Sequence, residues 1–160
     1  MMRRLGLFVL CVLAISVGSA LERAVAAPDG RLAGDYRITG KITKSSDGSR
    51  GEVRSRIWRF RPLCNHGPCR RVLLVRHGPR GSAFRSFLKR KRAGVWRGVE
   101  RKRIPCAGRG RAKQKATIRL RITRKARDGR ALAFRGRVKF VHPCPDGRFV
   151  EKARVFGRAR

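Results

Sequence analysis

The stretch TIRLRITRKARDGRALAFRGRVKF, residues 117–140, decides the fold of this chain. Apolar residues such as Ile118, Leu120 and Ile122 occupy alternate positions in both halves, and Lys or Arg fills most of the positions between them. Alternation with a period of two predicts β-strands that turn one face to a core and the other to solvent. Because the turn signal Asp128-Gly129 separates the halves, the stretch predicts an antiparallel hairpin with a basic outer face.

The pairing register of this hairpin follows from the same alternation. Ile122 and Phe134 both belong to the apolar set, and they face one core only if the numbers of paired residues sum to an even value. A two-residue loop would make the sum odd, whereas the three-residue loop 127–129, with Gly129 in the left-handed conformation, makes it even. Ile122 then lies opposite Phe134 and Leu120 opposite Gly136. The outer face carries two opposed arginine pairs, Arg121 with Arg135 and Arg119 with Arg137.

The rest of the chain shows the same pattern, and helical periodicity is nearly absent after residue 26. Turn signals rich in Gly, Pro, Ser and Asp separate the apolar stretches. We predict strands at 34–44, 52–61, 70–77, 83–91, 95–104, 115–125, 131–141 and 148–157, with a basic loop at 107–114. Short connections imply antiparallel neighbours, so the expected fold is an all-β, eight-strand meander. A closed barrel is favoured because it removes exposed strand edges, and a two-sheet sandwich is the alternative.

The beginning of the chain predicts export. A positive pair, Arg3 and Arg4, precedes an apolar run at residues 5–17, and small residues follow at Ala24-Val25-Ala26. This is the layout of a cleaved secretory signal peptide, and the run is shorter than the ~20 residues of a membrane span. We place cleavage after Ala26, with Ala20 as the alternative. Residues 27–33 are then a flexible leader, residues 34–160 form a single β domain, and the mature protein is secreted or periplasmic.

The cysteines fit this compartment. Cys64, Cys69, Cys106 and Cys144 remain after cleavage, and an even number in an exported chain of this size indicates two disulfides. Three pairings are open in principle. The spacer Asn65-His66-Gly67-Pro68 favours a turn, which supports a Cys64–Cys69 bond and leaves Cys106 to pair with Cys144. In the loop-entropy description the two closures stabilise the fold by about 2 and about 4 kcal/mol.

Two short patches resemble the strand starts of known barrel families. Gly34-Asp35-Tyr36 and Gly94-Val95-Trp96 have the Gly-x-aromatic pattern that opens strands in lipocalin-like and avidin-like barrels. This resemblance implies the barrel architecture only. The segment from Trp58 through Cys64 to Cys69 also resembles that of small secreted bacterial β proteins to which no function is attached, so it implies no activity.

The charge of the chain bounds its partners. Lys and Arg number 43 against 9 Asp and Glu, a net charge of +34, which becomes +32 once the three arginines and one glutamate of residues 1–26 are removed. Such a surface attracts polyanions, and opposed like charges on a sheet destabilise it by roughly 0.2–1 kcal/mol per pair. We therefore predict a non-enzymatic domain that binds anionic polymers or an anionic envelope surface, with nucleic acid bound only without sequence specificity. The predicted binding residues are Arg119, Arg121, Arg135 and Arg137, together with Lys89, Arg90, Lys91, Arg92, Arg101, Lys102 and Arg103 on the hairpin at 89–103.

A small-molecule carrier is the first alternative. An eight-stranded barrel can hold one modest ligand, and Tyr36, Trp58, Trp96 and Phe134 could line a cavity for an apolar one. Ordinary core packing explains the same aromatic residues.

A small secreted enzyme that acts on an anionic polymer is the second alternative. Glu100, beside Arg101 and Lys102, is the one local candidate for a general base. The sequence carries no nucleophile elbow or phosphate-binding loop, and we expect no cofactor. Cys64, His66 and Cys69 could in principle bind zinc, but oxidation of the cysteines in an exported chain argues against a metal site.

Overall fold

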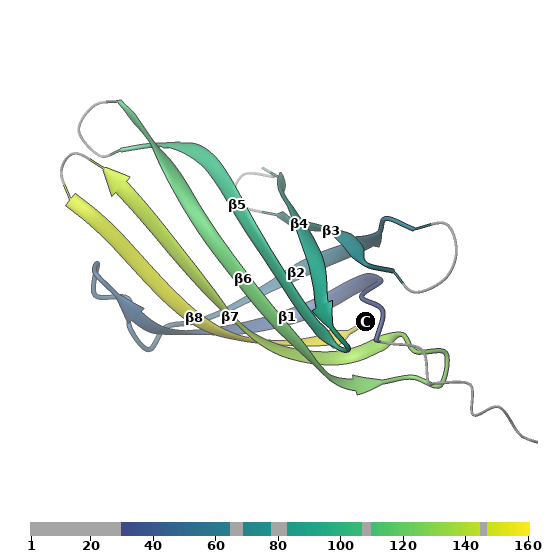
Figure 1. Cartoon of the computed structure of the whole chain (residues 1–160). Helices are drawn as coiled ribbons and strands as arrows, with labels where there is room; N and C mark the ends of the chain where they lie inside the picture. Colours follow the sequence, from purple (N-terminus) through teal and green to yellow (C-terminus); the bar gives the residue numbers. More distant parts are fainter. Residues whose placement is uncertain (1–29, 65–68, 78–82, 107–109, 145–146) are drawn as a thin grey trace, which may run out of the picture.

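The computed structural model describes residues 30–64, 69–77, 83–106, 110–144 and 147–160, and this part of the chain consists of eight β-strands without a helix. Each strand pairs antiparallel with the next, and β1 also pairs with β8, so the sheet closes into a barrel (Figure 1). This confirms the predicted eight-strand antiparallel barrel over the sandwich. The strands are β1 (Gly34–Ser45), β2 (Val53–Pro62), β3 (Arg71–His77), β4 (Ala83–Arg92), β5 (Val95–Pro105), β6 (Arg111–Lys125), β7 (Ala131–Cys144) and β8 (Gly147–Ala159).

The observed strands lie where the alternation predicts them, and the largest differences are at the start of β6 and the end of β7. β6 begins at Arg111, four residues before its predicted start, so 111–114 is strand and not part of the basic loop. Ala112 and Gln114 are buried while Arg111 and Lys113 are exposed, which is itself a period-two pattern. β7 extends to Cys144, three residues beyond its predicted end. Residues 107–109 of the predicted loop, like the predicted signal peptide at 1–26, lie outside the described residues.

The predicted register of the β6–β7 hairpin is confirmed. Ile122 pairs with Phe134 and Leu120 pairs with Gly136. The loop is closed by a hydrogen bond from the Ala126 amide to the Arg130 carbonyl, which leaves three residues between them, and Gly129 has φ of 78°. The ladder shifts by one residue at two places near Arg124, and because the two shifts cancel, the register predicted from the loop is kept.

Aromatic side chains fill one end of the barrel, which we call the closed end. Tyr36, Phe60 and Phe134 pack edge to face or at a tilt, with ring centroids 5.2–5.6 Å apart. The Tyr36 hydroxyl donates to the Ala131 carbonyl at 2.6 Å, so this buried polar group is satisfied. Gly157 lies directly under Phe134, where a Cβ would overlap the ring, so glycine at this position lets the large ring cross the interior.

The segment before β1 covers this closed end. The Arg31 amide donates to the Gly129 carbonyl at 2.8 Å, and the Ala131 amide donates to the Arg31 carbonyl at 2.9 Å. Leu32 is fully buried in the aromatic core. Residues 30–33 are therefore anchored as a cap, in contrast to the flexible leader expected for 27–33; residues 27–29 lie outside the described residues. The burial of Leu32 supplies the physical reason.

Both predicted disulfides are present. Cys64 pairs with Cys69 beside the core at the closed end, with their Cα atoms 5.5 Å apart. Cys106, which follows β5, pairs with Cys144 at the end of β7, with their Cα atoms 5.7 Å apart. The second bond links the two long hairpins β5–β6 and β7–β8 near their far ends, which project together at the upper left of Figure 1. We call this end of the barrel the open end.

The ladder between β4 and β5 has four residue pairs, the fewest of the eight ladders among the described residues. It covers Leu88 to Arg92 on β4, and the residues of β4 before Leu88 pair only with β3. Side chains bridge the two strands beyond that point. Glu100 on β5 accepts hydrogen bonds from Ser86 on β4 and from Arg76 on β3. The Lys102 ammonium lies 3.6 Å from the centroid of the Phe84 ring.

Candidate functional site

The outer face of β6 and β7 carries the four predicted arginines in two opposed pairs. Arg119 pairs with Arg137 and Arg121 with Arg135, and all four side chains are exposed. Directly opposed residues on neighbouring strands lie about 5 Å apart. The register therefore brings four positive charges into one small area.

This group belongs to a longer row that runs across the sheet. Starting from the Arg119–Arg137 pair, each neighbouring strand places another basic residue directly opposite the last one. On one side Arg119 faces Arg97, and on the other Arg137 faces Arg154. The complete row, which we call the basic row, has seven members on seven consecutive strands: Arg71, Lys89, Arg97, Arg119, Arg137, Arg154 and Lys41.

No carboxylate neutralises the basic row within the part of the chain that the structure describes. All seven members are exposed. The guanidinium of Arg71, at one end of the row, lies over the Phe87 ring, 5.5 Å from its centroid. The ion pairs of the described residues lie elsewhere. They join Asp35 to Arg59, Glu52 and Glu151 to Arg54, and Glu100 to Arg76.

The middle of the basic row lies in a hollow of the outer surface. Arg97, Arg119, Arg137 and Arg154 line this hollow, with Lys41 at one side. Arg121, Arg135 and Arg92 also reach it, so the second arginine pair of β6 and β7 adds to the same positive area. A bound anion would therefore contact guanidinium groups from several strands at once.

The remaining predicted binding residues are spread over different faces. Lys89 is a member of the basic row, and Lys91 and Arg92 are exposed near the tip of the β4–β5 hairpin. Arg101 and Arg103 are exposed farther along β5, opposite Lys115 and Lys113 of β6. Arg90 and Lys102 share the inward parity of Trp96, and Lys102 lines an interior cavity. The segments 89–92 and 101–103 therefore do not form one patch.

The four aromatic residues proposed as a cavity lining also separate. Tyr36, Trp96 and Phe134 are fully buried in the core of the closed end. Trp58 is the one of the four that lines the interior cavity, and its ring stacks on Phe134 with centroids 6.3 Å apart. The packing of the other three accounts for their burial without a ligand.

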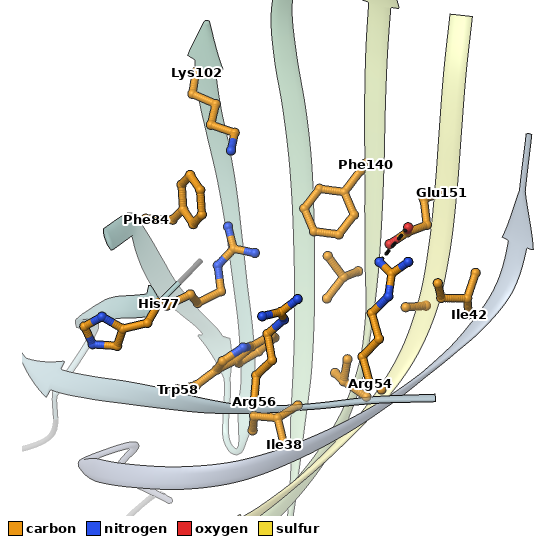
Figure 2. Close-up of a pocket in the computed structure, with 15 residues that line it drawn as sticks. Ile38, Ile42, Arg54, Arg56, Trp58, His77, Phe84, Lys102, Phe140 and Glu151 are labelled. Carbon is orange, nitrogen blue, oxygen red and sulfur yellow. Dashed lines mark hydrogen bonds and ion pairs between the residues drawn. The ribbon is translucent and has the colours of Figure 1, made fainter. Parts of the chain in front are cut away.

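The interior cavity lies toward the open end and has a volume of about 220 Å³. Its apolar wall comes from five strands and includes Trp58, Phe84 and Phe140 (Figure 2). Among these apolar groups stand four cationic side chains. They are Arg54 and Arg56 on β2, Arg76 on β3 and Lys102 on β5.

Two of these cations have carboxylate partners. Arg54 binds Glu151 across the cavity at 3.2 Å and Glu52 at 2.7 Å, and the Glu151 contact is drawn in Figure 2. Hydrogen bonding to Glu52 raises the pKa of the Arg54 guanidinium, which stays charged. Arg76 binds Glu100 inside the barrel, yet its buried Nε atom has no hydrogen-bond partner.

The other two cations have no carboxylate partner among the described residues. Arg56 makes no ion pair there, and Figure 2 shows its guanidinium turned toward the interior. Burial lowers the pKa of the Lys102 ammonium, an effect that the nearby Glu100 charge opposes. Burial likewise lowers the pKa of His142, which contacts Gln114 at 2.8 Å farther toward the open end. The cavity thus combines an apolar wall with excess positive charge.

The alternation in β2 did not reveal these inward arginines. Val53 and Ile57 have one parity while Trp58 and Phe60 have the other, so either set could face the core. The β1–β2 ladder runs without a register shift, from Gly34 opposite Phe60 to Lys41 opposite Val53. Trp58 and Phe60 are buried and Val53 is 60% exposed, which turns Arg54 and Arg56 inward. The two large aromatic residues were the signal that could have decided the parity.

Glu100, the predicted general base, is buried, and its carboxylate accepts hydrogen bonds from two residues of other strands. Arg76 and Ser86 donate to the same oxygen, Oε2. Within the described residues, no three His, Cys, Asp or Glu side chains gather where they could hold a metal ion.

Comparisons with known proteins give no functional assignment. No family model matches the chain, and no curated protein or solved structure is significantly similar to it. In the ranges that the structure describes, no helix is long and apolar enough to cross a bilayer.

Proposed function

We propose that the mature domain binds linear polyanions along the basic row, without catalysis. The observation that carries this proposal is the unbroken succession of seven basic residues on seven consecutive strands, with no carboxylate among them. Opposed like charges cost the sheet stability, and a bound anion would relieve that cost. Five of the seven are arginines, whose planar guanidinium group holds phosphate, sulfate or carboxylate oxygens in pairs.

The geometry of the row favours a flexible polymer. With strands about 4.8 Å apart, its six intervals span roughly 29 Å along the outer surface. The row follows the sheet around the barrel, so a flexible single chain can reach more of its members than a flat surface can. An anionic envelope surface remains the alternative target, and it would engage mainly the central arginines in the hollow.

The compartment in this proposal is extracellular or periplasmic. The two disulfides are compatible with such an oxidising location. The proposed signal peptide at 1–26 would deliver the chain there. Export would keep this strongly basic surface away from cytosolic nucleic acid and would bring it to envelope polymers or extracellular polyanions.

The test compares two variants that remove the same charge from different places. The row variant changes Arg97, Arg119, Arg137 and Arg154 to Gln. The control variant changes Arg50, Arg61, Arg111 and Arg148 to Gln; these residues are exposed, and none is paired with a basic residue in the ladders. Affinity for a fluorescent single-stranded oligonucleotide and for a heparin oligosaccharide is measured over a range of salt concentrations.

If polymers follow the row, the row variant loses up to four phosphate contacts. For the oligonucleotide, the slope of log K plotted against log salt concentration should then be shallower by up to about 3, because each phosphate contact contributes about 0.7 to that slope. The control variant should keep nearly the whole slope. Affinity should also rise with polymer length until the chain spans roughly 29 Å and rise more slowly beyond that. Equal losses in the two variants would reduce binding to general charge attraction and would contradict the proposal.

A further inference from the structure

The interior cavity offers a second site, separate from the basic row. We propose that it binds a small monoanion with a compact apolar body, such as an aromatic carboxylate. The site faces the inside of the barrel, whereas the basic row lies on the outside, so this proposal does not depend on polymer binding.

The apolar part of the ligand is indicated by the wall. Trp58, Phe84 and Phe140 contribute aromatic surface, and aliphatic side chains such as Ile38 and Val155 complete it. The cavity volume of about 220 Å³ exceeds the roughly 150 Å³ of an apolar cavity that holds benzene. A single ring with one small substituent therefore matches the available space.

The charge of the ligand is indicated by the lining. Of the four cations in the lining, Arg54 is paired with Glu52 and Glu151, and Arg76 is paired with Glu100, so two cations remain without a carboxylate. Arg56 and Lys102 are the two cations that lack one among the described residues. Arg56 lines the cavity but is exposed, and Lys102 is half-buried. A carboxylate ligand seated against the apolar wall would supply the ion-pair partner that both cations lack.

Arg76 adds a third observation. Its guanidinium lies 5.8–6.0 Å from the ring centroids of Trp58, Phe84 and Phe140, the three aromatic residues of the wall. These rings and Glu100 hold the group in place. Its buried Nε–H still has no acceptor within the described part of the chain. A ligand oxygen in the cavity would provide an acceptor for this donor.

Three probes separate the two parts of the recognition. Benzoate carries both the ring and the charge, benzyl alcohol carries the ring without the charge, and acetate carries the charge without the ring. Binding is measured by titration calorimetry at about 0.15 M salt, where exposed charges more than about 8 Å apart are screened. The indole N–H resonances of Trp58 and Trp96 report where the probe binds, because Trp58 lines the cavity and Trp96 is buried in the core. A Trp58→Phe variant assigns the two signals.

The variants test each part of the site. Arg56→Gln and Lys102→Gln each remove one charge from the lining, and Arg97→Gln removes one from the basic row. Gly40→Val fills the cavity instead, since Gly40 lines it and a Cβ there makes only ordinary contacts, the nearest 3.5 Å from Val155 Cγ1. Urea unfolding of each variant confirms that it is folded before binding is compared.

We expect saturable binding of benzoate that shifts the Trp58 signal, with benzyl alcohol and acetate at least tenfold weaker. Arg56→Gln and Lys102→Gln should each weaken benzoate binding by about tenfold, the effect of losing one hydrogen bond to a charged group. Gly40→Val should abolish it, and Arg97→Gln should leave it unchanged. The proposal is overturned if millimolar benzoate does not bind saturably, if benzyl alcohol binds as well, or if Arg97→Gln weakens binding as much as the cavity variants.

Discussion

Removing one charge from the centre of the basic row should stabilise the fold. Arg137 on β7 stands directly opposite Arg119 on β6 and Arg154 on β8, so it takes part in two opposed like-charge pairs. Each such pair costs roughly 0.2–1 kcal/mol. Arg137→Gln should therefore raise the free energy of unfolding by about 0.4–2 kcal/mol at low salt, because it removes both repulsions and little packing.

The measurement is equilibrium unfolding in urea, which is uncharged and leaves electrostatic effects intact. With an m value of about 2 kcal/mol per M, the midpoint should rise by about 0.2–1 M. The increase should be present at about 0.01 M salt, where the Debye length is about 30 Å, and should largely disappear at about 1 M salt, where it is about 3 Å. Salt dependence of this kind would identify repulsion as the cause.

Arg148→Gln is the matched control. Arg148 is also an exposed arginine on a strand, but it lies opposite Pro143 and not opposite another basic residue. Its midpoint should change little at either salt concentration. The reasoning would be refuted if Arg137→Gln lowered the midpoint at low salt, or if Arg148→Gln raised it equally.

Three further predictions concern packing inside the barrel and the dependence of stability on pH in the acid range. Gly136→Ala should destabilise the fold by about 1–3 kcal/mol in urea unfolding, because the added Cβ would overlap the backbone of the neighbouring strand. Glu100→Gln should cost about 3–5 kcal/mol in the same assay, since it leaves the buried Arg76 charge without its partner. Hydrogen bonds from Arg59 hold the pKa of Asp35 below its usual 3.8, so the stability from this pair is complete above that pH and is lost as the pH falls below it. Asp35→Asn should therefore flatten the acid limb of the pH–stability curve.

Each of these outcomes has a control. Gly40→Ala places its Cβ at ordinary contact distance and should change stability much less than Gly136→Ala. If Glu100→Gln cost no more than an exposed substitution, the interior ion pair would not contribute as described. Unchanged acid unfolding in Asp35→Asn would show that the exposed Asp35–Arg59 pair adds nothing measurable, as is common for surface pairs.

The sequence was sufficient for the strands, the meander and the register of one hairpin. Alternation of apolar and basic residues is a local property of a strand, so Ile118 to Ile122 could be assigned without knowledge of any partner. A short loop makes the partner local as well, which is why the Ile122–Phe134 register could be derived from the position of Gly129. The Cys64–Cys69 bond was accessible for the same reason, because both cysteines flank one turn.

Tertiary structure decided the two candidate sites, because each depends on pairings between residues far apart in the chain. Lys41 joins the basic row, opposite Arg154, only through the closure of β8 onto β1, which no local pattern specifies. Arg54 and Arg56 face the interior because Trp58 and Phe60 take the core side of β2, and the larger aromatic surface outweighs Val53 and Ile57. Period two assigns each residue to a face, but only the closed sheet determines which charges on that face become neighbours.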